Sequence, residues 1–303
     1  MGSEPKVVRL PLTDVVQVAK AQKAHEFFKP DTFELTFGSP PYLDRRTYGE
    51  NMDMGLKDWL QMMMDATLSC LRVTSGAVVW VVSGTGGLTY TPGPEALVYT
   101  MRLLHPEVNI LRPCIWAKNS PPTGSGWYSN DWEYCLAFSN KPLLPAWDPE
   151  ALQEVLKYTS GGSFRQRKKN GDRSAGSAYP THKFRKRPSN VFWAEDTHEA
   201  PEDWNGDLHY VPVGGGLLGW KDCHLNEAPF PEKLVARFVK TLTNPGGLVF
   251  DPFCGSGTTL DVAYQLGRVG YGFDLRESQV ALTKRRLTEM HPELFGAYYV
   301  SSQ

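Results

Sequence analysis

The sequence predicts an α/β protein built around buried, parallel strands. Short apolar runs alternate with stretches of helical periodicity, which is the pattern of strand, helix and strand units. The clearest unit lies near the C-terminus, where residues 248–250 and 269–273 read as apolar strands and residues 258–266 as a helix that Gly267 ends. The chain has 303 residues, of which 41% are hydrophobic, so it is long enough for one large α/β domain with a small insert.

The same patterns predict the remaining elements. We expect strands at 33–37, 77–82, 110–117 and 131–138, and helices at 14–28 and 95–104 and from Asp58, Pro231 and Glu277 onward. Asp58 is expected to cap its helix. On the last helix, Lys284, Arg285 and Arg286 are expected to form a solvated face.

A glycine loop joins the strand and helix of the C-terminal unit. It reads Asp-Pro-Phe-Cys-Gly-Ser-Gly-Thr-Thr over residues 251–259, and Gly255 and Gly257 let backbone N–H groups approach a ligand closely. A triphosphate is disfavoured because no Lys follows the loop. Asp274 ends the next strand, where a carboxylate accepts both hydroxyls of a ribose. The pattern favours an adenosine without phosphates, and an ordinary strand-to-helix turn is the alternative.

A second distinctive corner, Ser39-Pro40-Pro41-Tyr42, follows the strand at 33–37. Two consecutive prolines fix the backbone and remove two donors, so the local carbonyls remain as acceptors and the Tyr ring is held rigidly. This corner suits a planar group that carries an amino substituent. A proline-rich turn with a packing Tyr is the structural alternative.

Together these two motifs resemble the S-adenosylmethionine-dependent DNA methyltransferases that modify exocyclic amino groups. The order, tetrapeptide first and glycine loop last, is similar to their beta group. The resemblance implies a Rossmann-like fold with circularly permuted motifs, a mostly parallel sheet and helices on both faces. It also implies three parts: a catalytic-motif half at 1–149, a target-recognition insert at 150–220 and a cofactor-binding half at 221–303.

The resemblance assigns roles to residues of both motifs. The catalytic residues that it implies are Ser39, Pro40, Pro41 and Tyr42. The residues that it implies for S-adenosylmethionine are Asp251, Pro252, Phe253, Gly255, Gly257, Thr258, Thr259 and Asp274, together with Phe230. Phe230 belongs to a Phe-Pro pair that resembles the family element lying against the cofactor's methionine part.

A basic segment indicates a nucleic-acid partner. Between residues 164 and 187 there are nine Lys or Arg residues and one acid, Asp172. Phosphates neutralise such a segment with release of counterions, and DNA is the natural partner, whereas a solvated basic loop is the alternative. Arg45 and Arg46, directly after the tetrapeptide, are further candidates for phosphate contacts. The basic residues of the segment are Arg165, Arg167, Lys168, Lys169, Arg173, Lys183, Arg185, Lys186 and Arg187.

The implied reaction is methyl transfer to the amine of a flipped base. The amine's lone pair is delocalised into the ring, so acceptors aimed at its hydrogens, the Ser39 side chain and the Pro40 carbonyl, favour a reactive geometry while Tyr42 stacks on the base. Within the family, Ser at the first position of this tetrapeptide usually accompanies methylation of cytosine N4, and Asp usually accompanies methylation of adenine N6. Ser39 therefore favours cytosine N4, and adenine N6 stays open as the alternative. An RNA or protein-amide methyltransferase and a non-catalytic DNA-binding protein are alternatives of other classes.

Composition narrows the setting. Five cysteines, at 70, 114, 135, 223 and 254, show neither an even count nor metal-like spacing, so we expect no metal and reduced thiols in a cytoplasmic protein. The Cys after Pro113 also fits a nucleophile pattern, but it sits inside an apolar strand pattern. No apolar run approaches about 18 residues, so no membrane partner is expected. The resemblance implies that double-stranded DNA is the partner and that the protein associates with the nucleoid of a prokaryote or of a phage-infected cell. A homodimer and a cognate restriction endonuclease stay open.

Overall fold

The computed structural model describes residues 12–43, 54–84, 90–118, 132–152, 163–164, 172, 177–178, 190–192, 220, 222, 225 and 231–295. The chain forms two compact units: Met1–Trp147 with Asn190–Gln303, and Asp148–Ser189. In the second unit, β7 (Ser163–Phe164) and β8 (Ser177–Ala178) pair antiparallel. The division at 150 and 220 stays a prediction, and two residues of that span, β9 (Val191–Phe192), pair with the sheet of the first unit.

The first unit alternates strands and helices. Its first half contains α1 (Leu12–Val15), β1 (Val16–Val18), η1 (Ala21–Lys23), α2 (Ala24–Phe27), β2 (Phe33–Gly38), α3 (Leu56–Val73), β3 (Thr74–Val82), α4 (Gly93–Leu104), β4 (Asn109–Ile110), β5 (Cys114–Ala117) and β6 (Trp132–Ser139). Its second half contains α6 (Glu232–Leu242), β10 (Leu248–Asp251), α7 (Thr258–Gln265), β11 (Val269–Asp274), α8 (Glu277–Met290) and α9 (Pro292–Phe295).

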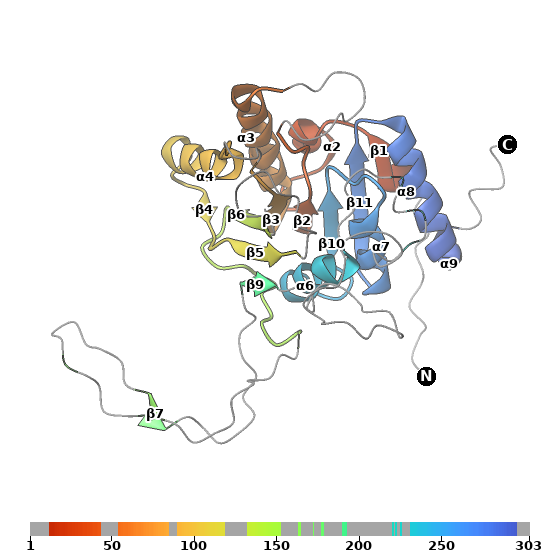
Figure 1. Cartoon of the computed structure of the whole chain (residues 1–303). Helices are drawn as coiled ribbons and strands as arrows, with labels where there is room; N and C mark the ends of the chain where they lie inside the picture. Colours follow the sequence, from red (N-terminus) through yellow and green to blue (C-terminus); the bar gives the residue numbers. More distant parts are fainter. Residues whose placement is uncertain are drawn as a thin grey trace. The chain divides into compact units, whose positions relative to one another are not determined.

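One mostly parallel sheet organises these elements. Its described strands follow the order β1, β11, β10, β2, β3, β6, β5, β9, and β4 pairs with β6 (Figure 1). In this order, each strand is parallel to the next as far as β3, which includes β1, β11, β10 and β2. In contrast, β6 pairs antiparallel with β3 and β5. The chain runs outward from β10 to β11 on one side and from β2 to β3 on the other. The boundary between β10 and β2 is therefore the topological switch point, where open α/β sheets bind ligands.

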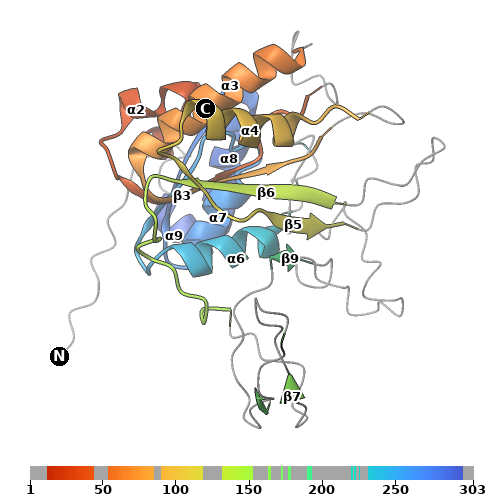
Figure 2. The same ribbon diagram turned by 90° about the vertical axis from the view of Figure 1, so that its left-hand side faces the viewer.

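Helices cover both faces of the sheet, and α3 and α4 lie on the side opposite α6 (Figure 2). Along β3 the side chains alternate between the two layers: Val78, Trp80 and Val82 pack with α3 and α4, whereas Ala77, Val79 and Val81 pack with α6 and α7. A central strand that is buried on both faces reads as a continuous apolar run, as the sequence does here. The predicted α/β fold with helices on both faces is confirmed.

The N-terminal segment differs from the sequence-based prediction. The expected helix over 14–28 is wrong, because the chain forms α1, then β1, then η1 and α2. β1 pairs in parallel with β11, placing Val16 opposite Gly272 and Val18 opposite Asp274. Pairing with β11 satisfies the backbone groups on one side of this edge strand, and two valines around Gln17 fit either periodicity over so short a span.

Two other local predictions are also wrong. The helix α3 begins at Leu56 with Gly55 as its N-cap, and Asp58 is an exposed residue of the first turn, where a carboxylate still complements the helix dipole. The expected strand over 110–117 is broken between Ile110 and Cys114, where Pro113 cannot donate a ladder hydrogen bond. None of the helices in the described part of the chain has the length and apolar composition needed to cross a membrane.

Candidate active site

The two motifs meet where β2 and β10 end. The parallel register sets residues 249–250 opposite 35–36, so both motifs leave the same edge of the sheet. A Cβ added to Gly38 would lie 2.6 Å from Asp251 Oδ1, so only glycine fits at this position. Residues more than two hundred positions apart in the chain therefore form one site at the switch point.

The glycine loop follows β10 as a tight turn that opens α7. Gly255 and Gly257 adopt φ angles of +50° and +80°, which favour glycine. The Gly257 N–H donates to the Cys254 carbonyl (2.7 Å), and the Thr283 hydroxyl of α8 donates to the Gly255 carbonyl (2.8 Å). One hydrogen bond within the loop and one from α8 thus fix its shape, and the positive end of the α7 dipole faces the edge of the sheet.

Asp274 ends β11 beside this loop. Its Oδ2 accepts from the Gly255 N–H at 3.1 Å and its Oδ1 from the Arg276 N–H at 2.9 Å, and the residue is 9% exposed. Oδ1 also lies 3.6 Å from Arg276 Nε, whereas Oδ2 has a second lone pair with which it can accept a hydroxyl. The half-buried Phe253 stacks edge-on against Trp80 (5.6 Å between ring centroids) and supplies a flat apolar surface nearby.

Asp251, at the junction of the two motifs, is 1% exposed and accepts the Phe253 N–H at 3.0 Å. Burial raises its pKa to about 7. Strongly shifted carboxylates often mark functional sites, because tight packing around a ligand excludes the water that would solvate the charge.

The Ser39–Tyr42 corner is held by contacts that the sequence did not indicate. The Trp59 indole of α3 donates to the Pro41 carbonyl at 2.7 Å. The Tyr42 hydroxyl donates to Glu133 Oε2 of β6, and the Lys118 ammonium, just after β5, donates to Glu133 Oε1, both at 2.5 Å. Sequence reasoning assigned no role to these three supporting residues.

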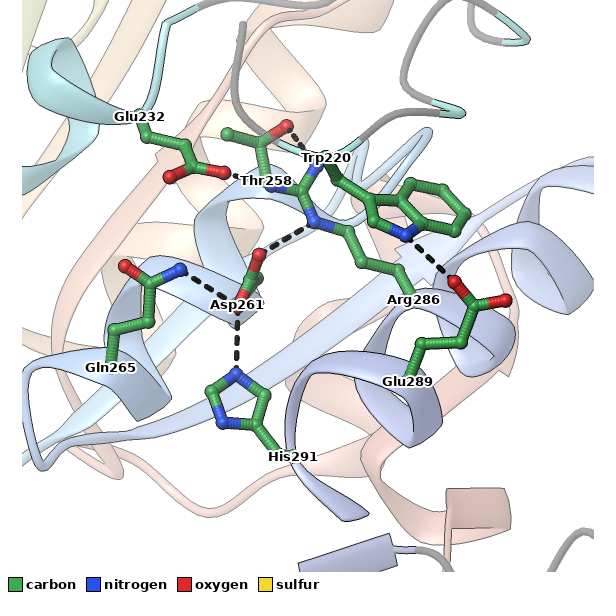
Figure 3. Close-up of polar contacts among 8 residues, drawn as sticks. All are labelled: Trp220, Glu232, Thr258, Asp261, Gln265, Arg286, Glu289 and His291. Carbon is green, nitrogen blue, oxygen red and sulfur yellow. Dashed lines mark hydrogen bonds and ion pairs between the residues drawn. The ribbon is translucent and has the colours of Figure 1, made fainter.

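A buried cluster of charges lies behind the glycine loop (Figure 3). Arg286 of α8 is fully buried and donates to Asp261 Oδ2 (2.7 Å), Thr258 Oγ1 (3.0 Å) and Glu232 Oε1 (2.5 Å). His291 Nε2 lies 2.7 Å from Asp261 Oδ1. Burial acts to raise the pKa of Asp261, but the His291 hydrogen bond and the Arg286 charge together hold it below its usual value.

This cluster corrects the prediction for the last helix: Arg286 does not belong to a solvated face. It ties the starts of α6 and α7 to α8. The Thr258 hydroxyl is engaged by Arg286, so its backbone N–H, at the helix start, is the group that this residue can offer a ligand.

Some of the predicted site residues belong to ranges that the structure does not describe. Phe230, Arg45 and Arg46 lie outside the described residues, and so do the nine basic residues predicted to bind DNA, Arg165, Arg167, Lys168, Lys169, Arg173, Lys183, Arg185, Lys186 and Arg187. Cys114, which resembled a nucleophile, starts β5, and burial raises its pKa to about 11, the opposite of an activated thiol. Within the described ranges no group of three His, Cys, Asp or Glu residues could hold a metal ion.

A doubly wound sheet with a glycine loop, an acid on the next strand and a proline-fixed corner at its switch point defines a Rossmann-like methyltransferase. A family model described as DNA methylase, covering N6 and N4 methyltransferases, matches residues 33–285. The chain belongs to this family, and it is a DNA methyltransferase that depends on S-adenosylmethionine.

Individual relatives agree with this membership. The Type II methyltransferase M.HpaI from Haemophilus parainfluenzae is 23% identical over 276 residues, which span 89% of this chain and 72% of the relative. Two solved structures share the fold: TTHA0409 from Thermus thermophilus, complexed with S-adenosyl-L-methionine (21% identity, TM-score 0.57, 91% of this chain and 94% of that one), and the cytosine-N4-specific PvuII DNA methyltransferase (16% identity, TM-score 0.60, 93% and 92%).

The residues at this edge fit the cofactor. Asp274 has carboxylate oxygens that can accept hydroxyls, Phe253 has an apolar ring, and the loop has no Cβ at Gly255 and Gly257, whose own N–H groups bond to Asp274 and to the Cys254 carbonyl. When bound, S-adenosylmethionine supplies an electrophilic methyl group.

Proposed function

We propose that the protein methylates the exocyclic N4 of cytosine in duplex DNA, after flipping the base out of the helix. The observation that carries the proposal is the junction at the switch point, where the Ser39–Tyr42 corner and the glycine loop leave neighbouring parallel strands. A group bound on one corner therefore lies next to a group bound on the other.

In the proposed mechanism the corner prepares the amine. Trp59 already occupies the Pro41 carbonyl, so we assign the Ser39 hydroxyl oxygen and the Pro40 carbonyl as the acceptors for the amine hydrogens. These acceptors favour a pyramidal nitrogen, and the Tyr42 ring stacks on the base. Held in this way, the amine nitrogen would form its bond to the methyl carbon as the carbon–sulfur bond of the sulfonium breaks, with orientation as the main source of acceleration.

Cofactor contacts are proposed for both ends of the glycine loop. The residues that we assign to S-adenosylmethionine are Asp251, Pro252, Phe253, Gly255, Gly257, Thr258, Thr259, Asp274 and Phe230. The basic segment of residues 165–187 and the arginines at 45 and 46 are assigned to DNA phosphates. The similarity to a Type II methyltransferase supports a cognate restriction endonuclease as a partner in the cell.

The choice of cytosine rests on Ser39, because the cytosine-N4 enzymes that this chain resembles have Ser at the first position of the tetrapeptide. Both amines present two hydrogens, so adenine N6 is the second candidate, and the matched family covers both. The deciding experiment incubates the protein with unmethylated duplex DNA and S-adenosylmethionine, digests the DNA to nucleosides and identifies the product by mass. We expect N4-methylcytosine. N6-methyladenine would overturn the base assignment, and methylation of RNA but not DNA would overturn the substrate.

A further inference from the structure

Methyl transfer to an amine leaves a proton that must be removed. When the neutral amine nitrogen gains a methyl group it becomes cationic and carries one hydrogen more than the product. A neutral serine hydroxyl is too weak a base to keep that proton, so the Ser39 corner needs a stronger acceptor within reach.

The structure contains a directed chain of hydrogen bonds from Ser39 to such an acceptor. Ser39 Oγ lies 3.5 Å from Tyr42 Oη, at the outer limit of hydrogen bonding, with the serine as donor. The Tyr42 hydroxyl in turn donates to Glu133 Oε2 at 2.5 Å. Because both donors point toward Glu133, the Ser39 lone pairs face away from Tyr42, in the sense required to accept from an amine. Long catalytic hydrogen bonds commonly tighten when the substrate binds.

Glu133 is placed for this role by the hairpin of β5 and β6. Glu133 is 6% exposed. Because residues 39–42 include no carboxylate, the acceptor must come from another part of the chain. In the described part of the chain, the groups that face Glu133 are the Tyr42 hydroxyl, the Lys118 ammonium at 2.5 Å and the Cys135 thiol, whose pKa burial raises well above its usual value. Lys118 balances the carboxylate charge, and its side chain is 14% exposed.

We propose that Glu133 receives the proton released by the target amine, through Ser39 and Tyr42. The inference rests on the proposed function. As the N–H bond of the cationic amine breaks, an O–H bond forms on Ser39 Oγ. The original Ser39 proton moves to Tyr42 Oη, and the original Tyr42 proton moves to Glu133 Oε2. Nitrogen keeps the bonding pair and becomes neutral, the two hydroxyls are regenerated, and the carboxylate becomes a carboxylic acid.

The first test removes the acceptor while keeping its shape. Glu133→Gln retains an oxygen that accepts a hydrogen bond from Tyr42, but this amide cannot take up a proton. Tyr42→Phe retains the stacking ring but interrupts the chain of hydrogen bonds. We expect each variant to lower the single-turnover methyl-transfer rate about 100-fold, the low end of what a positioned base contributes. The double variant should lose no more. Dissociation constants for S-adenosylmethionine and DNA should stay within threefold of the wild type.

The matched control is Glu26→Gln, the same chemical change in an exposed pair with Lys23 on the surface, which should leave the rate unchanged. A Glu133→Gln rate within threefold of the wild type would overturn the proposal. If Glu133→Gln does not fold, Tyr42→Phe decides, and a wild-type rate in that variant would also overturn it.

The second test supplies a proton acceptor that does not need the hydrogen bonds from Ser39 to Glu133. Ser39→Asp places a carboxylate directly at the amine, so adding Glu133→Gln in that background should lower the rate less than threefold. A structural role for Glu133 would give the same 100-fold loss in both backgrounds and would overturn the relay. If Ser39→Asp abolishes transfer, the pH profile decides. The profiles of the wild type and Glu133→Gln should differ in shape at acid pH, and identical profiles would overturn the relay. Absence of methyl transfer by the wild type itself would instead contradict the proposed function.

Discussion

Asp251 illustrates how one residue couples the site to stability. Its folded pKa is about 7, against 3.8 for an ordinary Asp, because burial disfavours the charge. The folded protein therefore holds a proton that the unfolded chain has released between these values. The stability that this contributes is complete below about pH 4 and is lost as pH rises through about 7.

We expect Asp251→Asn, which mimics the protonated acid, to remove this dependence. Urea unfolding of both proteins from pH 5 to 8 should show the wild type losing stability relative to the variant, by up to about 1.4 kcal/mol per pH unit below pH 7. A difference between the two proteins that is independent of pH would show that Asp251 has an ordinary pKa.

Arg286 shows what residue patterns can and cannot give. The prediction of a solvated basic face treated positions 284–286 as a run of charges. The buried positions of α8, including Gln279, Leu282, Thr283 and Arg286, follow the spacing i, i+3, i+4 and i+7, which marks the inner face. The signal for burial was therefore present in the sequence. Its three partners come from α6 and α7, and no local pattern indicates those contacts.

At the scale of elements, the strand, loop and helix of the cofactor side depend on the glycine that opens α7. Gly257 has a φ of +80°, and an added Cβ would lie 2.7 Å from Thr283 Cγ2 of α8. Gly267, which ends the same helix, has a φ of +71° and no atom within 4 Å of an added Cβ. A side chain at either glycine would thus strain the backbone, but only at Gly257 would it also collide with a neighbouring atom.

We expect Gly267→Ala to cost about 1 kcal/mol, the strain of a left-handed residue alone. Gly257→Ala should cost more than about 2 kcal/mol and weaken S-adenosylmethionine binding at least 10-fold, because the loop must move away from α8. Chemical denaturation and calorimetric titration measure both effects. Equal losses of stability and unchanged cofactor affinity would contradict the tight loop geometry.

The packing of α6, α7 and α8 depends on the buried Arg286 cluster. Arg286→Met leaves Asp261 and Glu232 without their common partner, and breaking a buried ion pair in this way costs about 3–5 kcal/mol. The control is Arg285→Met on the same helix, whose side chain is 37% exposed and pairs with Asp222, so it should cost about 1 kcal/mol or less. Equal free energies of unfolding for the two variants would show that the cluster does not stabilise the fold.

Most elements were predictable from the sequence, and the exceptions have physical reasons. Long periodic helices such as α3 and α6 and fully apolar strands such as β3 carry strong local signals. The three-residue strand β1 does not, because only its pairing with β11 distinguishes it from a helical turn. Pro113 by its residue type predicts a break in the strand, but the apolar residues around it led to the prediction of one continuous strand.

At the scale of the whole molecule, the adjacency of β2 and β10 could not be derived from propensity or spacing. It came from the resemblance of both motifs to one family, and the register of the two strands now supplies it directly. The Glu133 contact with Tyr42 is of the same kind, because it joins residues 91 positions apart, one just after β2 and one on β6, with β3 between the two strands. Such contacts are set by the order of strands in the sheet.

The whole molecule must also hold a polyanion, which predicts a dependence on salt. The triple change Arg167→Gln, Lys168→Gln and Lys169→Gln should weaken DNA binding and reduce the slope of log affinity against log salt by about 0.9 for each phosphate that the segment no longer neutralises. The matched control neutralises three exposed lysines of the described core, Lys20, Lys23 and Lys29, and should leave the slope unchanged. Fluorescence anisotropy with duplex DNA between 50 and 200 mM salt, an interval over which about six phosphate contacts change affinity roughly 1000-fold, resolves the difference. Both triple variants should bind S-adenosylmethionine like the wild type, because neither changes a residue assigned to the cofactor. Equal slopes for the two variants would place the phosphate contacts outside the basic segment.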